Sequence, residues 1–416
     1  MLSVTEASER ILAEIKPLAV ETVPLRQALG RILAEDVSAR VTMPPWSNSS
    51  MDGYAVRSAD ITAVMTGEPV KLRVVATVAA GGFAPRSLRR GEAMRIMTGA
   101  PIPDGADSVI RKEDTDGGSE KVEIREARDV WKNIRGAGED YQSGDLLAKR
   151  GASIRPALLG VLASTGVATV SVFGQPRVAI ISSGNELVDL DEFEEVIAAR
   201  RIVSTNSYTL EALTRVAGGI PQDLGIASDT KASLRKKLDT AAGSDLIITS
   251  AGVSVGDLDH TRDVFAALGG KQKFWKVKMR PGAPLAFGLL KGVPWLGLSG
   301  NPVSAMVSFE LFVRPALRKM QGHVALFRRP VTVTLEENVK IATKLTHFLR
   351  AWVTRHEDGS LTARLTGHQS SGALTSMSKA NALLIVPPTK QTVPKGEQLN
   401  VLMLDHSLEE TSAFSL

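Results

Sequence analysis

The stretch VAIISSGNEL (178–187) passes from apolar residues into small and polar ones, and DLIITSAGVSVGD (245–257) and WLGLSGNPVS (295–304) repeat this change. A short apolar run of this kind is typical of a buried strand, and the small residues after it mark a turn. Helix-like segments such as STNSYTLEALTRVAGG (204–219) separate the three runs. Strands that alternate with helices predict an α/β fold with a mainly parallel sheet.

The regions on either side of this α/β part have a different composition. Short strand-like runs between long loops precede it, and strand-like runs such as VTVTL and ALLIVP, with a hairpin turn at Asp358-Gly359, follow it. The predicted organisation is multidomain α/β plus β. Its boundaries are 1–43 with 144–173 for a split N-terminal linker domain, 44–143 for a β-rich inserted domain, 174–326 for the α/β domain and 327–416 for a small, barrel-like all-β domain.

The amino-acid composition excludes several kinds of site. The chain of 416 residues contains no cysteine, which removes disulfides, thiolate metal ligands and cysteine nucleophiles. Its six histidines lack the HxxxH or HxH spacing of zinc and iron sites. The formal charge of +5 is small for this length and forms no concentrated basic stripe, so we expect no nucleic-acid partner.

We expect a cytoplasmic protein without a membrane span. The segment MLSVTEASERILAEIK (1–16) carries charges where a signal peptide needs an apolar run. The uncharged run 156–176 is interrupted by glycines and hydroxyl residues. It predicts a buried helix, a turn and a strand rather than a transmembrane helix.

The three strand-end turns predict an oxyanion site. In an open parallel sheet, ligands bind beyond the carboxyl ends of the strands, where helix N-termini and free N–H groups converge. Glycine lets the backbone approach an anion, and hydroxyls donate to it. Tight structural turns are the alternative interpretation. The candidate binding residues here are Ser183, Gly184, Ser250, Gly252 and Asn301, the last as cap of a helix that begins at Pro302.

Acidic residues accompany these turns. Glu186 follows the first turn, Asp257 and Asp259 follow the second, and Asp229 follows the strand-like QDLGIAS. Carboxylates that act together with substrate phosphates are the common way in which proteins hold Mg²⁺. Each carboxylate alone is also consistent with a helix cap or a solvated charge.

The segment FWKVKMRPGAP places Lys276, Lys278 and Arg280 at alternating positions. In an extended strand all three project to one face, where like charges repel unless an anion or solvent lies over them. A second anion-binding element is therefore predicted, with a solvated edge strand as the alternative.

The long loops of the inserted domain carry further candidates. PPWSNSSMDGYAV, IMTGAPIP and IRGAGEDYQSGD contain the chemical groups Asp52, Thr98, Glu139 and Asp140. Loops of this length carry function more often than short connectors do. Trp46, Trp131 and Tyr54 are predicted to pack beneath these loops.

At these motifs the chain resembles the molybdopterin molybdenumtransferases, the MoeA type that includes the E domain of gephyrin. The resemblance spans nearly the whole chain. The blocks that carry it are SSMDGYAV, RIMTGAPIPDGAD, IRGAGED, SSGNELV, STNSYTL, TSAGVSVGDLDHT, FWKVKMRPGAPLAFG, GLSGNPVSAMVSFELFV and TGHQSSGALTSMSKANALLIVP.

The resemblance implies a homodimer of four-domain subunits with a MogA-like α/β domain. It implies an active site between this domain and the second domain of the opposite chain, which would contribute Asp52, Thr98 and Asp140. Glu186, Asp229 and Asp259 would hold Mg²⁺ and the nucleotide end of the substrate. The positions associated with molybdate or the anionic substrate are Lys276, Arg280, Ser304, Arg350 and Ser371.

Three positions depart from the family pattern. Ala283 stands where relatives commonly have lysine, Ser299 where they commonly have proline, and Arg280 where a lysine is common. One positive charge fewer at residue 283 is expected to weaken anion affinity. A planar guanidinium at residue 280 keeps the charge with a different geometry.

The resulting prediction is an enzyme that inserts molybdate into adenylylated molybdopterin and releases AMP with the help of Mg²⁺. The alternatives are a molybdopterin adenylyltransferase and a gephyrin-like scaffolding protein. Expected partners are a MogA-type adenylyltransferase and factors that deliver the cofactor to molybdoenzymes. The preference for molybdate over tungstate, and the carboxylate that transfers a proton, are left open.

Overall fold

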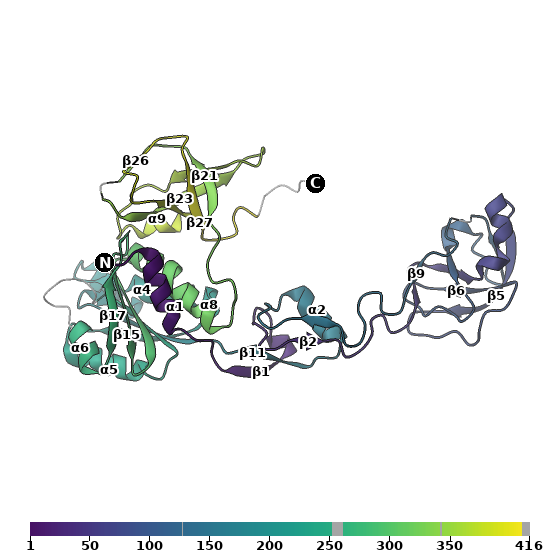
Figure 1. The fold of residues 1–416 in the computed structure, drawn as a ribbon, viewed down its shortest axis with the longest axis horizontal. Coiled ribbons are helices and arrows are strands. Elements are labelled where there is room, and N and C mark those ends of the chain that lie inside the picture. Colours follow the sequence, from purple (N-terminus) through teal and green to yellow (C-terminus); the bar gives the residue numbers. More distant parts are fainter. Residues whose placement is uncertain (127, 252–260, 342, 410–416) are drawn as a thin grey trace. The chain divides into compact units, whose positions relative to one another are not determined.

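The structure, a computed structural model, describes residues 1–126, 128–251, 261–341 and 343–409 (Figure 1). The chain forms two compact units. Unit 1 comprises 1–21, 30–34 and 171–416, and unit 2 comprises 22–29 and 35–170. The boundaries of the four domains stay predictions.

A six-stranded sheet forms the centre of unit 1. Its strands, in spatial order, are β15 (Ile220–Ala227), β12 (Arg177–Ser183), β16 (Leu246–Ser250), β20 (Val293–Leu298), β19 (Pro284–Leu290) and β17 (Lys271–Lys276). The first four strands run parallel, and β19 and β17 add antiparallel pairings at one edge. The predicted α/β class with a mainly parallel sheet is confirmed.

Helices cover both faces of this sheet. Along β12, Val178 and Ile180 join one buried cluster, whereas Ala179 and Ile181 join another, because successive strand residues point to opposite faces. The first face is covered by α1 (Val4–Glu14), α4 (Thr205–Val216), α7 (Pro302–Ser308) and α8 (Arg314–Met320), and the second by α5 (Lys231–Ala241) and α6 (Thr261–Ala267) (Figure 1). A π-helical turn, Phe309–Val313, joins α7 to α8.

The N-terminal helix begins with a complete capping box. The Ser3 hydroxyl accepts from the Glu6 N–H, and the Glu6 carboxylate accepts from the Ser3 N–H. This geometry satisfies two N–H groups that the first helical turn leaves without partners. Ala7 and Ile11 then bury the inward side of α1 against the sheet.

The C-terminal part of unit 1 is a closed five-stranded barrel. Its strands follow the order β23 (Thr346–Arg355), β24 (Leu361–Leu365), β21 (Val331–Leu335), β27 (Gln398–Met403) and β25 (Ala382–Val386), and β25 pairs back with β23. The predicted barrel-like domain and its turn at Asp358-Gly359 are confirmed. Smaller elements here are α9 (Leu374–Ser378) and the pair β22 (Val339–Lys340) with β26 (Thr392–Val393).

The barrel is joined to the α/β part by main-chain pairing. Strand β18 (Met279–Arg280) leaves the end of β17 and pairs in parallel with β23. Phe348, Met377 and Leu383 of the barrel pack into the same core as α7. The loops of the barrel are therefore held against the strand ends of the central sheet.

Unit 2 is built around a five-stranded sheet. Its order is β7 (Ser108–Arg111), β4 (Gly53–Val56), β6 (Glu92–Ile96), β5 (Val70–Val78) and β8 (Lys121–Ile124). Short pairs join β3 (Asn48–Ser49) to β9 (Ile134–Arg135) and β2 (Val37–Ser38) to β10 (Leu146–Ala148). Where the chain passes between units, β1 (Val20–Pro24) pairs with β11 (Thr169–Phe173).

Helix α2 (Pro156–Ser164) corrects one prediction. Its sequence PALLGVLAS predicted a buried helix, but Leu162 is its one fully buried residue. Within the described part of the chain, no helix is both long and apolar enough to cross a membrane.

Candidate functional site

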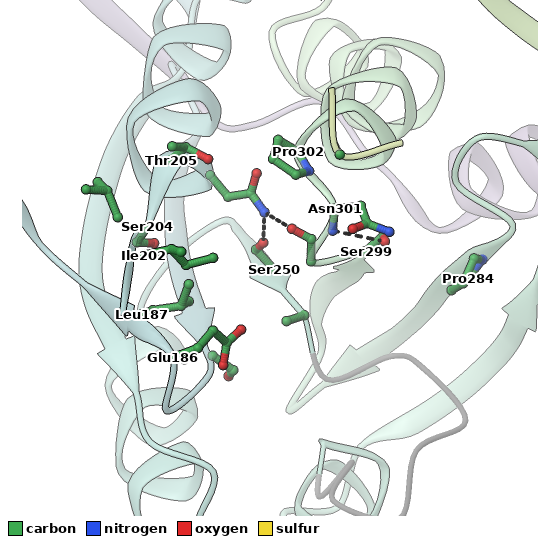
Figure 2. Close-up of a pocket in the computed structure, with 16 residues that line it drawn as sticks. Glu186, Leu187, Ile202, Ser204, Thr205, Ser250, Pro284, Ser299, Asn301 and Pro302 are labelled. Atoms are coloured by element: carbon green, nitrogen blue, oxygen red, sulfur yellow. Dashed lines mark hydrogen bonds between the residues drawn. The ribbon is translucent and has the colours of Figure 1, made fainter. Parts of the chain in front are cut away.

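The carboxyl ends of β12, β16 and β20 open into a cavity of about 570 Å³, here called the Glu186 pocket (Figure 2). Its walls come from the three predicted strand-end turns and from the first turn of α4. The lining residues are Ser183, Glu186, Leu187, Ile202, Val203, Ser204, Thr205, Asn206, Ser250, Ala251, Pro284, Ser299, Gly300, Asn301, Pro302 and Gly372. The short strands β13 (Leu187–Val188) and β14 (Ile202–Val203) pair beside it, with α3 (Phe193–Ile197) between them in sequence.

Hydroxyl groups fasten α4 to the end of β12. The Ser207 hydroxyl lies 3.0 Å from that of Ser182 and 2.9 Å from that of Ser204, and all three residues are buried. These neutral contacts hold the first turn of α4 over the strand end without placing a charge there.

An amide then connects the other two turns. Asn206 is 7% exposed, and its Nδ2 donates to Ser250 Oγ at 2.6 Å and to the Gly300 carbonyl at 2.8 Å. The sequence predictions missed this residue. The signal available was the cluster of hydroxyl and amide residues in STNSYTL, which marks a helix start over a strand end.

The first turn places Glu186 at the rim of the pocket. Gly184 has φ +147°, and a Cβ built on it would lie 2.5 Å from a Glu186 carboxylate oxygen. A side chain at residue 184 would therefore displace this carboxylate. Figure 2 shows Glu186 on the opposite side of the pocket from Ser299 and Asn301.

The predicted metal ligands are only partly brought together. The Asp229 carboxylate accepts from the Asn185 N–H at 3.1 Å, and the Asn185 side chain accepts from the Asp229 N–H at the same distance. Asp229 is therefore held next to the residue that precedes Glu186, but it does not line the pocket. Gly252, Asp257 and Asp259 lie outside the described residues. Among residues that are described, no group of three or more acidic or histidine side chains is placed to hold a metal.

A second cavity of about 640 Å³, the Arg280 pocket, adjoins the first. The two share Pro284, Ser299 and Asn301. The remaining lining residues are Met279, Arg280, Pro281, Gly282, Ala283, Ser304, Leu345, His368, Gln369, Ser370 and Ser371. The predicted residues Arg280, Ser304, Ser371 and Asn301 are thus brought to one cavity.

The basic segment shows the predicted alternation. Lys276, Lys278 and Arg280 are exposed, and Val277 and Met279 between them are fully buried. The extended segment changes partners, because β17 ends at Lys276 and β18 begins at Met279. As a result Arg280 reaches the second pocket, whereas Lys276 does not line it.

The loop after Arg280 requires glycine. Gly282 has φ +90°, and a Cβ there would lie 2.5 Å from Ser308 Oγ in α7. The loop therefore packs directly against α7. Asn301 is the N-cap residue of this helix and Pro302 is its first residue. The predicted cap position is confirmed, although the Asn301 side chain makes no capping hydrogen bond.

Behind the second pocket lies a fully buried arginine. Arg350 is 0% exposed, and its guanidinium donates to the carbonyls of His368 and Ser370 at 3.2 and 2.9 Å. It also donates to Ser376 Oγ at 3.1 Å, while Nη1 has no partner among the described residues. Burial lowers the pKa of Arg350 to about 10, so it stays cationic at neutral pH.

Gln369 adds a second brace to the same barrel loop. Its Oε1 accepts from the Arg350 N–H at 2.9 Å, and its Nε2 donates to the Arg350 carbonyl at 3.1 Å. The Ser371 carbonyl accepts from the Val303 N–H at 3.1 Å, which ties the loop to α7. His368 and Gln369 were not predicted as site residues, and their place depends on closure of the barrel.

In unit 2 the structure brings two predicted residues together. The Asp52 carboxylate accepts from the Thr98 N–H at 2.7 Å and from the Thr98 hydroxyl at 2.8 Å. These two hydrogen bonds lower the pKa of Asp52 below its ordinary value. Glu139 accepts from the Gly136 N–H at 2.9 Å, which fixes its own loop. Asp140 is exposed, and its backbone N–H donates to the Met43 carbonyl.

The aromatic residues of unit 2 were predicted incorrectly in two of three cases. Tyr54 is buried, with its hydroxyl donating to the Gly118 carbonyl at 2.9 Å. Trp131 is 67% exposed, and Trp46 is 40% exposed and meets Phe83 edge to face. Composition alone does not distinguish an aromatic residue beneath a loop from one on its surface.

An α/β sheet whose strand ends carry adjoining acidic and basic pockets is typical of the class of proteins that bind anionic small molecules. Comparisons with known families identify the particular kind. The chain matches the MoeA N-terminal region (domain I and II) over residues 2–166, a probable molybdopterin binding domain over 179–319 and the MoeA C-terminal region (domain IV) over 332–404. It belongs to the molybdopterin molybdenumtransferase family of the MoeA type.

Curated relatives agree over the full length. A molybdopterin molybdenumtransferase 2 of Mycobacterium tuberculosis is 38% identical over 96% of this chain and 99% of the relative. A molybdopterin molybdenumtransferase of Haemophilus influenzae is 34% identical over 98% of this chain and 100% of the relative. The crystal structure of a molybdopterin biosynthesis MoeA protein from Pyrococcus horikoshii superposes with a TM-score of 0.80 at 30% identity, covering 97% of this chain and 99% of that one.

Proposed function

We propose that this chain inserts molybdenum from molybdate into adenylylated molybdopterin and releases AMP. The observation that carries the proposal is the adjacency of two chemically different pockets that share Pro284, Ser299 and Asn301. One pocket has a carboxylate at its rim and the other has a guanidinium in its wall. The carboxylate suits the nucleotide end of one substrate, whose phosphates would share a cation with it. The guanidinium suits an oxyanion as the second reactant.

The Arg280 pocket has the chemistry that a tetrahedral oxyanion requires. Arg280, Ser304 and Ser371 line it and supply a cation and two hydroxyl donors. The buried charge of Arg350 lies behind the loop that carries Ser371. Such fixed donors and charges stabilise developing negative charge without having to reorganise during the reaction.

The Glu186 pocket is proposed to hold the nucleotide end of the substrate. Glu186 and Asp229, together with Asp259, would supply the carboxylates for Mg²⁺. Glu186, the one of these three that lines the pocket in the described part of the chain, fits this ion, since Mg²⁺ is commonly held by one or two carboxylates with substrate phosphates completing its shell. When bound, the ion would neutralise phosphate charge. The protein's own contribution there is positioning: the Asn185 pairing fixes the Asp229 carboxylate, and Gly184 leaves room for that of Glu186.

A homodimer is proposed on the basis of the family resemblance. In it, Asp52, Thr98 and Asp140 would approach the α/β pockets of the opposite chain. The ordered Asp52–Thr98 pair supports a site role, because a carboxylate with two fixed donors is held in one orientation. A cytoplasmic location and the adenylyltransferase and delivery partners also stay predictions.

A single incubation separates the proposed activity from its alternatives. The purified chain is given adenylylated molybdopterin, Mg²⁺ and molybdate, and AMP release is followed. Molybdate-dependent release is expected; ATP consumption with free molybdopterin would indicate an adenylyltransferase, and neither activity would indicate scaffolding. Asp52→Ala and Asp140→Ala are expected to reduce release, and full activity in both variants would contradict a site shared across the dimer.

A further inference from the structure

The two cavities at the strand ends meet at three residues. Pro284, Ser299 and Asn301 line both the Glu186 pocket and the Arg280 pocket. Proline has no side-chain hydrogen-bond donor, so the polar side chains at this junction are those of Ser299 and Asn301. Asn301 was predicted as a binding residue, whereas the proposed function assigns no ligand contact to Ser299. A ligand group at the junction would be reached from both pockets.

The Ser299 hydroxyl is held in place and keeps its own hydrogen free. Its Oγ accepts from the Asn301 N–H at 3.3 Å (Figure 2). A hydroxyl that accepts one hydrogen bond can still donate one. Among the described residues, the Ser299 hydroxyl has no acceptor for its hydrogen. Ser299 is half-buried and lines both cavities, so a ligand in either cavity can reach it.

The charges around this hydroxyl favour a negatively charged acceptor. Arg280 lines the Arg280 pocket together with Ser299, and no acidic side chain is among the described residues that line it. Glu186, the acidic residue of the other pocket, lies on the opposite side from Ser299 (Figure 2). A ligand oxygen that carries negative charge is therefore the acceptor that this position suits.

We infer that the Ser299 hydroxyl donates to an oxygen of a tetrahedral oxyanion at the junction of the two pockets, and that Ser299 is a substrate-binding residue. This inference rests on the proposed function, which brings two such groups to the junction: the phosphate of the nucleotide end and molybdate. Both carry acceptor oxygens in the same tetrahedral arrangement. A hydroxyl has one hydrogen, so Ser299 bonds to one of them at a time.

The size of the effect follows from the charge of the acceptor. A hydrogen bond to a charged group contributes more free energy than one between neutral groups. Loss of the hydroxyl in Ser299→Ala is therefore expected to weaken binding of the oxyanion about tenfold. Ser299→Thr keeps the hydroxyl and should bind as the wild-type protein does. Ser299→Ala also removes the acceptor of the Asn301 N–H, so the ligand contact has to be separated from a role in shaping the loop.

The test measures binding of three probes to the full chain by calorimetry in the presence of Mg²⁺. AMP and adenosine differ by the phosphate, and sodium molybdate provides the second oxyanion. In Ser299→Ala, the affinity for AMP or for molybdate should fall about tenfold, while the affinity for adenosine stays the same. The anion that loses affinity is the one that Ser299 binds. Unchanged affinities for both anions overturn the inference. An equal loss for AMP and adenosine would mean that Ser299 only shapes the loop, and it overturns the inference as well.

A matched variant makes the same substitution outside both pockets. Ser378 is exposed at the end of α9, and its hydroxyl donates to the Thr375 carbonyl of its own helix at 3.0 Å. Ser378→Ala should bind all three probes as the wild-type protein does, and a loss as large as that in Ser299→Ala would contradict a specific contact. If Ser299→Ala does not fold, Ser299→Cys gives the same comparison, because a thiol is only a weak donor.

The outcome also distinguishes this inference from the proposed function. Unchanged affinities in Ser299→Ala would remove the role of Ser299 and leave the molybdenum transfer standing, since Arg280, Ser304 and Ser371 still line the anion pocket. Wild-type protein that binds neither AMP nor molybdate would overturn both.

Discussion

The two adjoining pockets of unit 1 differ in how their polar groups are satisfied. In the Glu186 pocket the polar groups are neutral and bonded to one another: the Ser207 hydroxyl contacts those of Ser182 and Ser204, and the Asn206 amide donates to Ser250 Oγ and the Gly300 carbonyl. In the Arg280 pocket, the surplus is of donors and positive charge, from Arg280 in the wall and from the unpaired Nη1 of Arg350 behind it. The positive charge therefore lies on the side of the Arg280 pocket, which suits an oxyanion, and the neutral first pocket with its rim carboxylate suits the nucleotide end of the proposed substrate.

The largest expected effect comes from removing the buried cation behind the Arg280 pocket. Arg350→Leu should lower kcat/KM for molybdate about a hundredfold, because the charge and the brace on the 368–370 loop are lost together. AMP binding should change little. Arg355→Leu, at the exposed end of the same strand, is the control. An Arg350→Leu enzyme with normal molybdate kinetics would remove the contrast between the pockets.

The second prediction concerns Gly282, in the loop that lines the Arg280 pocket, where a substitution adds a Cβ without changing the charge. Gly282→Ala should lower the free energy of unfolding by about 2 kcal/mol, since its φ of +90° and its approach to Ser308 both oppose a Cβ. Gly292→Ala has a similar φ of +87° but open space around it, and should cost about 1 kcal/mol. Chemical denaturation measures both values, and equal losses would show that packing on α7 is unimportant.

The third prediction distinguishes Arg280 from Lys276, which the sequence pattern predicted to lie on one face of a strand. Arg280→Ala should raise the KM for molybdate about tenfold through the loss of a charged donor at the pocket wall. Lys276→Ala should have a much smaller effect, because Lys276 does not line that pocket. Steady-state kinetics with varied molybdate decide the matter, and an equal rise in the two variants would place the anion nearer to Lys276.

The smallest effect concerns Asp52 of unit 2. Its folded-state pKa is lowered by the two Thr98 hydrogen bonds, so their stabilisation is present above the unfolded-state pKa and is lost as pH falls through the folded value. Thr98→Val removes the hydroxyl donor and keeps the N–H, so the pKa of Asp52 should rise part of the way to its ordinary value. NMR titration of the carboxyl carbon measures this shift. An unchanged pKa would mean that the hydroxyl bond is unimportant.

The sequence predicted those parts of the site that depend on local pattern. Apolar runs that end in Ser-Gly or Ser-Ala-Gly mark strand ends, and parallel strands bring such ends to one edge, so Ser183, Ser250 and Asn301 were predicted to lie together. The all-β character of the last domain was likewise predictable from short strands and turn residues. These features require no knowledge of distant contacts.

Other parts of the site depend on contacts that the local pattern does not contain. Asn206 reads as an ordinary residue near a helix start, and its importance arises because α4 crosses over the ends of β16 and β20. Arg350 lies in the strand LRAWV, and its burial follows from the return pairing of β25 with β23. The family resemblance supplied Arg350, whereas Asn206 was found only in the folded chain.

The most direct test of the division between the pockets is the position of molybdenum in crystals soaked with molybdate and AMP. We expect the anomalous signal of molybdenum in the Arg280 pocket, within hydrogen-bonding distance of Arg280 and Ser371, and the nucleotide in the Glu186 pocket. Molybdenum in the Glu186 pocket, or outside both pockets, would contradict the account.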